Sequence, residues 1–144
     1  MISIAIVQSK FNDEITDKML VRAREHAKKL GIKVVAEAVV PGAFDMPIMI
    51  KKLLEREDVD GIATVGAVIK GETMHDELIA NQLSRAIVEL SLQSGKPIGL
   101  GVMGPGITWE QAEARITQYS EQSVEAVLKL HNELNKVSGK SHML

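Results

Sequence analysis

Four short apolar segments alternate with longer segments of helical periodicity along this chain. The apolar segments are rich in Ile, Val and Ala, which is typical of strands buried on both faces. They cover residues 1–7, 33–40, 61–69 and 97–103. Because the connection between two parallel strands is usually a helix, this alternation predicts a parallel sheet. We therefore expect an α/β fold, a three-layer sandwich with a four-stranded parallel sheet flanked by helices on both faces.

Capping signals mark the ends of the intervening helices. Asn12 or Asp13 is expected to cap the first helix, and Gly31 is expected to end it. Thr108, followed three residues later by Gln111, predicts a capping box before the last helical region. The predicted helices span residues 13–30, 45–57 and 75–93, followed by two helical stretches that end near residue 136.

The composition excludes several classes of protein. The chain has 144 residues, no Cys and a formal net charge of −2, and its Lys and Arg are dispersed. The absence of Cys excludes disulfides and thiolate metal sites, and without a basic face we expect no nucleic-acid partner. No apolar run reaches the ~18 residues of a membrane span, and the N-terminus lacks the pattern of a signal peptide. We expect a cytoplasmic protein with one domain over residues 1–137 and a loose tail over residues 138–144.

Open parallel sheets bind their ligands beyond the carboxyl ends of the strands. The corresponding loops here cover residues 8–14, 41–45, 66–75 and 100–108. Aromatic residues make up only 3% of the chain, yet its two Phe residues, Phe11 and Phe44, fall in the first two of these loops. Each ring could simply cover an end of the sheet. Their joint placement favours a planar ligand held by stacking.

The third of these loops combines a potential anion site with a potential acid–base group. Gly71 allows the backbone to approach a ligand closely, and Thr73 precedes a helix whose first N–H groups attract negative charge. His75 lies at the start of that helix, where its imidazole can serve as a proton acceptor. Together these residues indicate proton transfer on a phosphorylated substrate. The alternative is a plain polar cap on an amphipathic helix.

Two other patterns are set aside on geometric grounds. Residues 99–104 match G-x-G-x-x-G, but they belong to the last predicted strand, so we interpret their glycines as small residues where backbones pack closely. His75, Asp76 and Glu77 point about 100° apart on a helix and cannot converge on one metal ion. His26 is expected on the surface of its helix.

Four blocks of this sequence resemble the 6,7-dimethyl-8-ribityllumazine synthase family, particularly its archaeal form. The blocks are residues 10–13 (KFND), 40–47 (VPGAFDMP), 66–77 (GAVIKGETMHDE) and, more weakly, 110–115 (EQAEAR). The third block is highly specific, and the resemblance runs from about residue 2 to residue 135. It implies a flavodoxin-like version of the predicted three-layer fold.

The resemblance also implies an activity and an assembly. Members of this family condense 5-amino-6-(D-ribitylamino)uracil with 3,4-dihydroxy-2-butanone 4-phosphate, which gives 6,7-dimethyl-8-ribityllumazine, phosphate and water. The reaction needs no cofactor and no metal. The implied partners are the two small-molecule substrates and further copies of the chain, with active sites at subunit interfaces. The implied assembly is a homopentamer, twelve of which can close into a 60-subunit capsid.

On the pyrimidine side, the resemblance assigns a role to each matching position. Phe11 matches the ring that stacks on the pyrimidine, Asp45 matches an acceptor for ribityl hydroxyls, and His75 matches the catalytic proton shuttle. The other matching positions are Ala43 and Phe44, which hold the uracil and its chain, and Ala67, Val68 and Ile69, which line the pyrimidine through backbone contacts.

On the phosphate side, Glu72 and Thr73 match the phosphate-binding pair. Only the N–H of Glu72 can serve, because its carboxylate would repel the anion. Leu100 and Arg115 match positions supplied by the neighbouring subunit, with Arg115 gripping the phosphate.

The sequence departs from the family pattern at two places. Leu100 stands where many relatives carry an aromatic residue, and residues 121–122 (EQ) stand where relatives often carry Lys or Arg. Two alternatives therefore stay open. One is the paralogous archaeal riboflavin synthase, against which the intact block at residues 71–75 argues. The other is a non-catalytic, self-assembling shell protein built on the same fold.

Overall fold

A computed structural model describes residues 1–71 and 74–139 of the chain. The strands are β1 (Ser3–Ser9), β2 (Lys33–Val40), β3 (Gly61–Ile69), β4 (Ile98–Gly99) and β5 (Val102–Ile107). The α-helices are α1 (Asp13–Lys29), α2 (Met46–Leu54), α3 (His75–Ser94), α4 (Trp109–Ala114) and α5 (Ile116–Val137), and a 3-10 helix, η1, covers Ala43–Asp45. The expected tail lies mostly outside the described residues.

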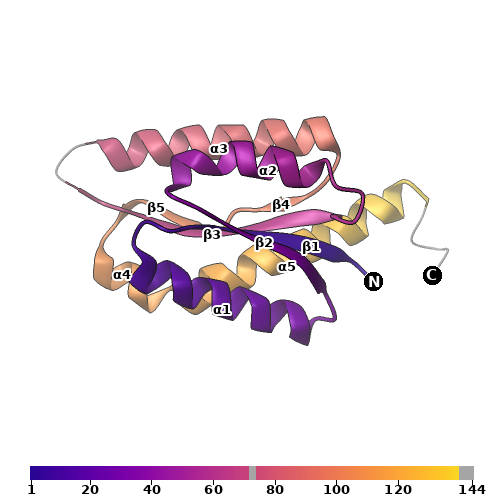
Figure 1. The fold of residues 1–144 in the computed structure, drawn as a ribbon, viewed down its shortest axis with the longest axis horizontal. Helices are drawn as coiled ribbons and strands as arrows, with labels where there is room; N and C mark the ends of the chain where they lie inside the picture. Colours follow the sequence, from indigo (N-terminus) through magenta and orange to yellow (C-terminus); the bar gives the residue numbers. More distant parts are fainter. Residues whose placement is uncertain (72–73, 140–144) are drawn as a thin grey trace.

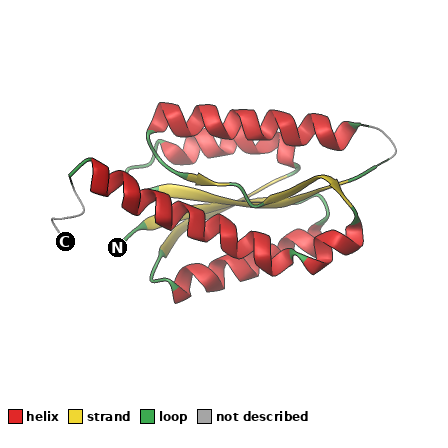
Figure 2. Cartoon of the chain, turned by 180° about the vertical axis from the view of Figure 1, so that it is seen from behind, coloured by secondary structure: helices red, strands yellow, loops and turns green. Residues whose placement is uncertain are grey.

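The strands form one parallel sheet between two layers of helices. The order is β2-β1-β3-β4, and β5 pairs with β3 beyond the end of β4. Helices α2 and α3 cover one face, while α1, α4 and α5 cover the other (Figures 1 and 2). The structure thus confirms the predicted α/β fold with helices on both faces of a parallel sheet.

Residues of the central strands alternate between the two hydrophobic layers. On β1, Ile4 and Ile6 pack toward α1 and α5, whereas Ala5 and Val7 pack toward α2 and α3. All four side chains are fully buried. Burial on both faces explains why this strand is an unbroken apolar run in the sequence.

The edge strand β2 departs from the expectation of double coverage. It pairs with β1 alone, and most of its residues are half-buried or exposed, with only Val40 buried. Its apolar sequence therefore does not report burial on both faces. A β-branched edge strand is still favourable, because Val packs well on a pleated, half-buried surface.

The expected fourth strand over residues 97–103 is two strands, and residues 104–106 (GPG), which fall in the expected loop over residues 100–108, are part of β5. Gly104 and Gly106 have φ values of 111° and 75°, so the chain bends here without leaving the sheet. Pro105 is tolerated because β5 pairs with β3 only, and an edge strand can lose a backbone donor. A Gly-Pro-Gly signal does not distinguish such an irregular edge strand from a turn.

Three expected helix features also differ. The helix expected over residues 45–57 begins with η1 and ends at Leu54. Leu30 lies beyond α1 and is exposed. His26, expected on a surface, is buried between α1 and α5, with its Nε2 atom 2.9 Å from Glu125 and its Nδ1 atom 3.8 Å from Glu121. Glu121 is thus part of the contact between these two helices.

Other local signals are confirmed. Gly31 ends α1 with a φ of 75°, and Thr108 and Gln111 exchange both hydrogen bonds of a capping box, at 3.2 and 2.9 Å. The apolar face of α3 packs on the core, with Leu83 and Ile87 buried. Within the described residues, no helix combines the length and the apolar character that crossing a membrane requires.

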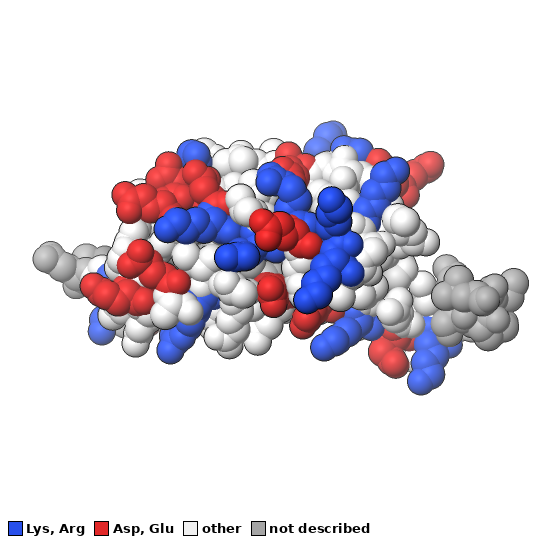
Figure 3. Space-filling model, turned by 90° about the horizontal axis from the view of Figure 1, so that it is seen from below, with Lys and Arg blue, Asp and Glu red and all other residues white. Residues whose placement is uncertain are grey.

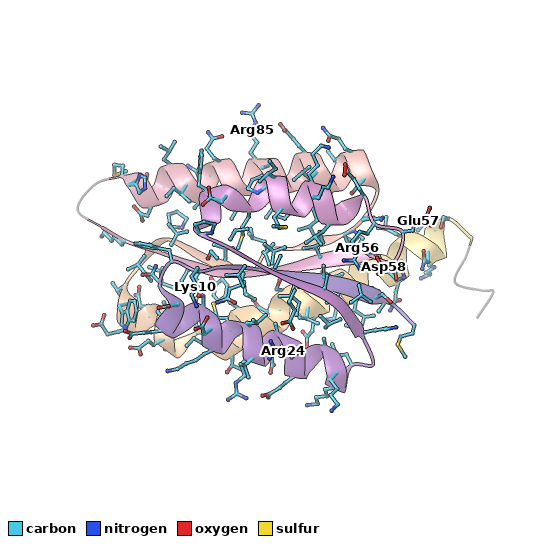
Figure 4. All side chains as sticks on the ribbon, viewed as in Figure 1. Lys10, Arg24, Arg56, Glu57, Asp58 and Arg85 are labelled. Carbon is cyan, nitrogen blue, oxygen red and sulfur yellow. The ribbon has the colours of Figure 1, made fainter. Side chains whose placement is uncertain are left out.

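A bidentate ion pair fastens α1 to the edge strand. Arg24 donates to both carboxylate oxygens of Glu37 over 2.7 and 2.8 Å, and Figure 4 labels Arg24 on α1. The hydrogen bond from Arg24 holds the pKa of Glu37 below its usual range, although partial burial opposes the shift. Figure 3 views the molecule from below Figure 1 and shows acidic and basic side chains interspersed over the face seen there.

We expect Arg24→Gln to destabilise the protein in a pH-dependent way. Because the pKa of Glu37 is lowered by folding, the pair stabilises above the unfolded Glu pKa of about 4.3 and loses this effect as pH falls below it. Both side chains are partly exposed, so the loss at pH 7 should not exceed ~1 kcal/mol. Urea unfolding at pH 7 and near pH 3 tests this. An equal loss at both pH values would show that the effect is not electrostatic.

Candidate active site

A pocket of about 390 Å³ lies at the carboxyl ends of β1, β2 and β3. It is lined by residues at the start of α1, in and before η1 and at the start of α3. Both α1 and α3 begin at the left of Figure 1. This is the edge at which open parallel sheets hold ligands. The residues that line it are Phe11, Asn12, Pro41, Gly42, Ala43, Phe44, Ala67, Val68, Ile69, Gly71, His75, Asp76 and Ile79.

The two Phe rings lie on the pocket wall and remain accessible. Backbone hydrogen bonds from Lys10 N to Val40 O (2.7 Å) and from Phe11 N to Pro41 O (3.0 Å) join the loops that carry them. Phe11 is 72% exposed and Phe44 is 64% exposed. Neither ring is therefore part of the hydrophobic core, and both leave apolar surface for a ligand to cover.

Asn12 fixes the first loop to the end of β3, a role that was not predicted from the sequence. Its backbone is left-handed, with a φ of 67°, and its side chain forms no cap on α1. The Asn12 Nδ2 atom donates instead to the carbonyl oxygen of Ala67 over 2.9 Å. Asn tolerates this conformation better than most residues, which is the signal that could have indicated it. The bond closes one side of the pocket.

Polar contacts beneath the first loop hold it against α1. The buried side chain of Gln8 donates to Thr16 Oγ1 over 3.1 Å and to Asp17 Oδ1 over 2.6 Å. The Nζ atom of Lys10 lies 3.6 Å from Asp17 and 3.7 Å from Asp13, and Figure 4 shows Lys10 near the start of α1. The loop that presents Phe11 is thereby held at both ends.

The first turn of α3 supplies the ionisable side chains of the pocket. His75 is the first residue of this 20-residue helix and lines the pocket together with Gly71. Asp76 is buried, and its Oδ2 atom accepts a hydrogen bond from Gly106 N over 2.9 Å. This contact joins the start of α3 to β5 and so positions His75. Glu72 and Thr73, the expected anion site, lie outside the described residues.

We expect Asp76→Ala to lower the free energy of unfolding by about 1–3 kcal/mol, because it leaves a backbone N–H in β5 without its partner. Asp76→Asn keeps an acceptor oxygen and should lose less. Glu77→Ala is the matched control, since Glu77 is the next residue and is exposed. Urea unfolding of the three variants tests the contact. Equal stability of Asp76→Ala and Glu77→Ala would show that the hydrogen bond contributes nothing.

Three of the expected site residues do not line this pocket. Asp45 is exposed at the end of η1, where its carboxylate accepts a hydrogen bond from Gly42 N over 2.9 Å. Leu100 lies between β4 and β5 and is 47% exposed, and Arg115 is exposed where α4 meets α5. The structure does bring together the expected residues of the other loops, namely Phe11, Ala43, Phe44, Ala67, Val68, Ile69 and His75.

The fold and the pocket define a class of protein. An open parallel sheet carries an aromatic-walled pocket beyond its strand ends, with an imidazole at the start of a helix, as in α/β enzymes that act on small molecules. Among residues 1–71 and 74–139, no group of three His, Asp or Glu side chains could hold a metal ion.

Comparison with known proteins identifies the family. The family described as 6,7-dimethyl-8-ribityllumazine synthase matches residues 1–135. The chain is 48% identical over 136 residues to the 6,7-dimethyl-8-ribityllumazine synthase of Sulfolobus acidocaldarius, which covers 94% of this chain and 86% of that protein. It is 51% identical over 129 residues to that of Metallosphaera sedula, with coverages of 90% and 85%. This chain belongs to the 6,7-dimethyl-8-ribityllumazine synthase family.

Proposed function

We propose that this protein is a 6,7-dimethyl-8-ribityllumazine synthase, a transferase of riboflavin biosynthesis. Relatives that are about half identical to this protein over nearly the whole chain carry that name. The observation that carries the proposal is the pocket, in which two exposed Phe side chains and His75 meet at the carboxyl edge of the sheet. A flat pyrimidine and a small phosphorylated ketone are the substrates that such a site fits.

In this proposal the pyrimidine substrate lies against Phe11. The backbone of Ala67, Val68 and Ile69 lines the edge of its ring, while Ala43 and Phe44 flank the start of the ribityl chain. Asp45 accepts from the ribityl hydroxyls, and the hydrogen bond from Gly42 N holds its carboxylate in place for this role. The aromatic face supplies stacking, and the backbone groups fix the orientation of the ring.

The chemistry then requires proton transfers near one imidazole. The substrate amine attacks the ketone, and loss of water forms an imine. Phosphate leaves by elimination, and the second amine closes the new ring on the remaining carbonyl with loss of a second water. His75 takes and returns protons in these steps, as a general base and acid. Much of the remaining acceleration comes from holding two small molecules face to face.

The phosphate requires a cation that this pocket lacks among its described residues. We propose that the amides of Glu72 and Thr73 bind it at the start of α3 and that Arg115 of a neighbouring copy pairs with it. Leu100 of the same neighbour contacts the pyrimidine. Both residues are exposed, and neither lines the pocket of its own chain, which supports sites shared between subunits.

Exposed apolar residues on α2 and α3 support an assembly of several copies. Ile48, Leu78, Val88 and Leu92 are each more than half exposed. Such surface is typical of regions that are covered in an oligomer. We propose a homopentamer, with closure into a 60-subunit capsid as the further step.

A direct assay tests the proposed function. The purified protein is incubated with 5-amino-6-(D-ribitylamino)uracil and 3,4-dihydroxy-2-butanone 4-phosphate, and fluorescence reports the lumazine product. We expect lumazine and one equivalent of phosphate. Riboflavin formed from added lumazine would instead indicate the paralogous synthase, and an assembled but inert protein would indicate a shell.

A further inference from the structure

The strand beside β3 is interrupted at Leu100, between β4 and β5. A side chain of β3 replaces the backbone hydrogen bond that would be expected there. β4 and the start of β5 keep one register along β3, which shifts only beyond Ala67. In that parallel register the Gly101 amide would donate to the carbonyl oxygen of Thr64. It donates to the Thr64 hydroxyl over 3.1 Å, and the same hydroxyl donates to Gly99 O over 2.7 Å. The Thr64 hydroxyl thus forms hydrogen bonds with the two residues that flank Leu100 in the sequence.

Ser123 of α5 completes this arrangement. Its hydroxyl donates to the carbonyl oxygen of Thr64 over 2.8 Å, and both side chains are fully buried. Helix α5 packs so closely that a Cβ atom at Gly99 would overlap the backbone of Ser123, and β3 lies so close that a Cβ atom at Gly101 would overlap the Thr64 carbonyl. This close packing explains the G-x-G pattern and agrees with the interpretation of these glycines as small residues where backbones pack closely. A buried and satisfied polar network of this kind is rigid.

These hydrogen bonds hold a large apolar side chain in an exposed position. Leu100 is 47% exposed and does not line the pocket of its own chain. We infer that Thr64 and Ser123 are positioning residues, which hold residues 99–101 so that Leu100 reaches the active site of a neighbouring subunit. The inference rests on the proposed function, in which Leu100 contacts the pyrimidine substrate of that site.

Thr64→Val tests this inference, because it keeps the shape of the side chain and removes both hydroxyl contacts. We expect KM for the pyrimidine substrate to rise about fivefold and kcat to change less than about twofold, since Leu100 is loosened while His75 is unaffected. Thr64→Ser keeps a hydroxyl and should return KM to near the wild-type value.

A double-mutant cycle separates positioning from a general structural role. In a Leu100→Ala background, Thr64→Val should raise KM by less than about twofold further, because its effect passes through Leu100. Ser123→Ala is expected to behave in the same way, and it provides the test if Thr64→Val does not fold. Ser91→Ala is the matched control, since the Ser91 hydroxyl also donates to a backbone carbonyl over 2.8 Å, on α3. We expect it to leave KM unchanged.

Two results would overturn the inference: an unchanged KM in Thr64→Val and Ser123→Ala, or an equal rise in KM with and without Leu100. These failures differ from a failure of the proposed function. In that case the wild-type protein itself would form no lumazine, and the inference would fall together with the function.

Discussion

Replacing His75 with Ala is expected to lower kcat about 100-fold while leaving both KM values within about threefold, because His75 moves protons rather than binding substrate. The loss should be incomplete, since the variant still holds the two substrates in contact. Steady-state kinetics with lumazine fluorescence measure both constants.

His131→Ala provides the matched control for this prediction. His131 lies on α5, where its Nε2 atom is 3.0 Å from Asn135 Nδ2, and it does not line the pocket. We expect wild-type kcat for this variant. Full kcat in His75→Ala would remove His75 from the mechanism, whereas an equal loss in both variants would point to folding rather than to catalysis.

Arg115→Ala is expected to raise KM for the phosphorylated substrate about 100-fold, because it removes a charge-assisted contact to the phosphate. KM for the pyrimidine substrate should change little. Arg115→Lys keeps the charge without the bidentate geometry and should recover only part of the loss. Kinetics with each substrate varied in turn distinguish the two effects.

Arg56→Ala is the control for the loss of a cation. Arg56 is also exposed, but it pairs with Asp58 over 2.6 Å at the opposite end of the molecule from Lys10 (Figure 4). We expect no change in either KM for this variant. An unchanged KM in Arg115→Ala would contradict the proposed role of Arg115 in binding phosphate.

The sequence predicted the parts of the fold that depend on local patterns. The bounds of β3 and the start of α3 agree with the prediction, because an apolar run and a change to helical periodicity define them. The split between β4 and β5 could not be predicted, because it depends on a bond between the Thr64 side chain and a distant backbone. Local signals carry no information on such contacts.

In the candidate site, too, some features could be predicted from the sequence and others depend on distant contacts. The joint placement of Phe11, Phe44 and His75 followed from the rule that ligands bind beyond the strand ends, and the pocket confirms it. The contacts of Asn12 with Ala67 and of Asp76 with Gly106 were not foreseen, because each joins residues at least 30 positions apart. The roles of these residues became visible only in three dimensions.

The central claim is that each active site combines His75 of one chain with Arg115 of another. Co-expression of the His75→Ala and Arg115→Ala chains, followed by purification of the mixed oligomer, tests it most directly. Random pairing of neighbours gives about a quarter of the sites both wild-type residues, so activity, assayed with the phosphorylated substrate well below its wild-type KM, should recover to about a quarter of the wild-type value. Activity that stays at the mean of the two separately assayed variants would contradict the account.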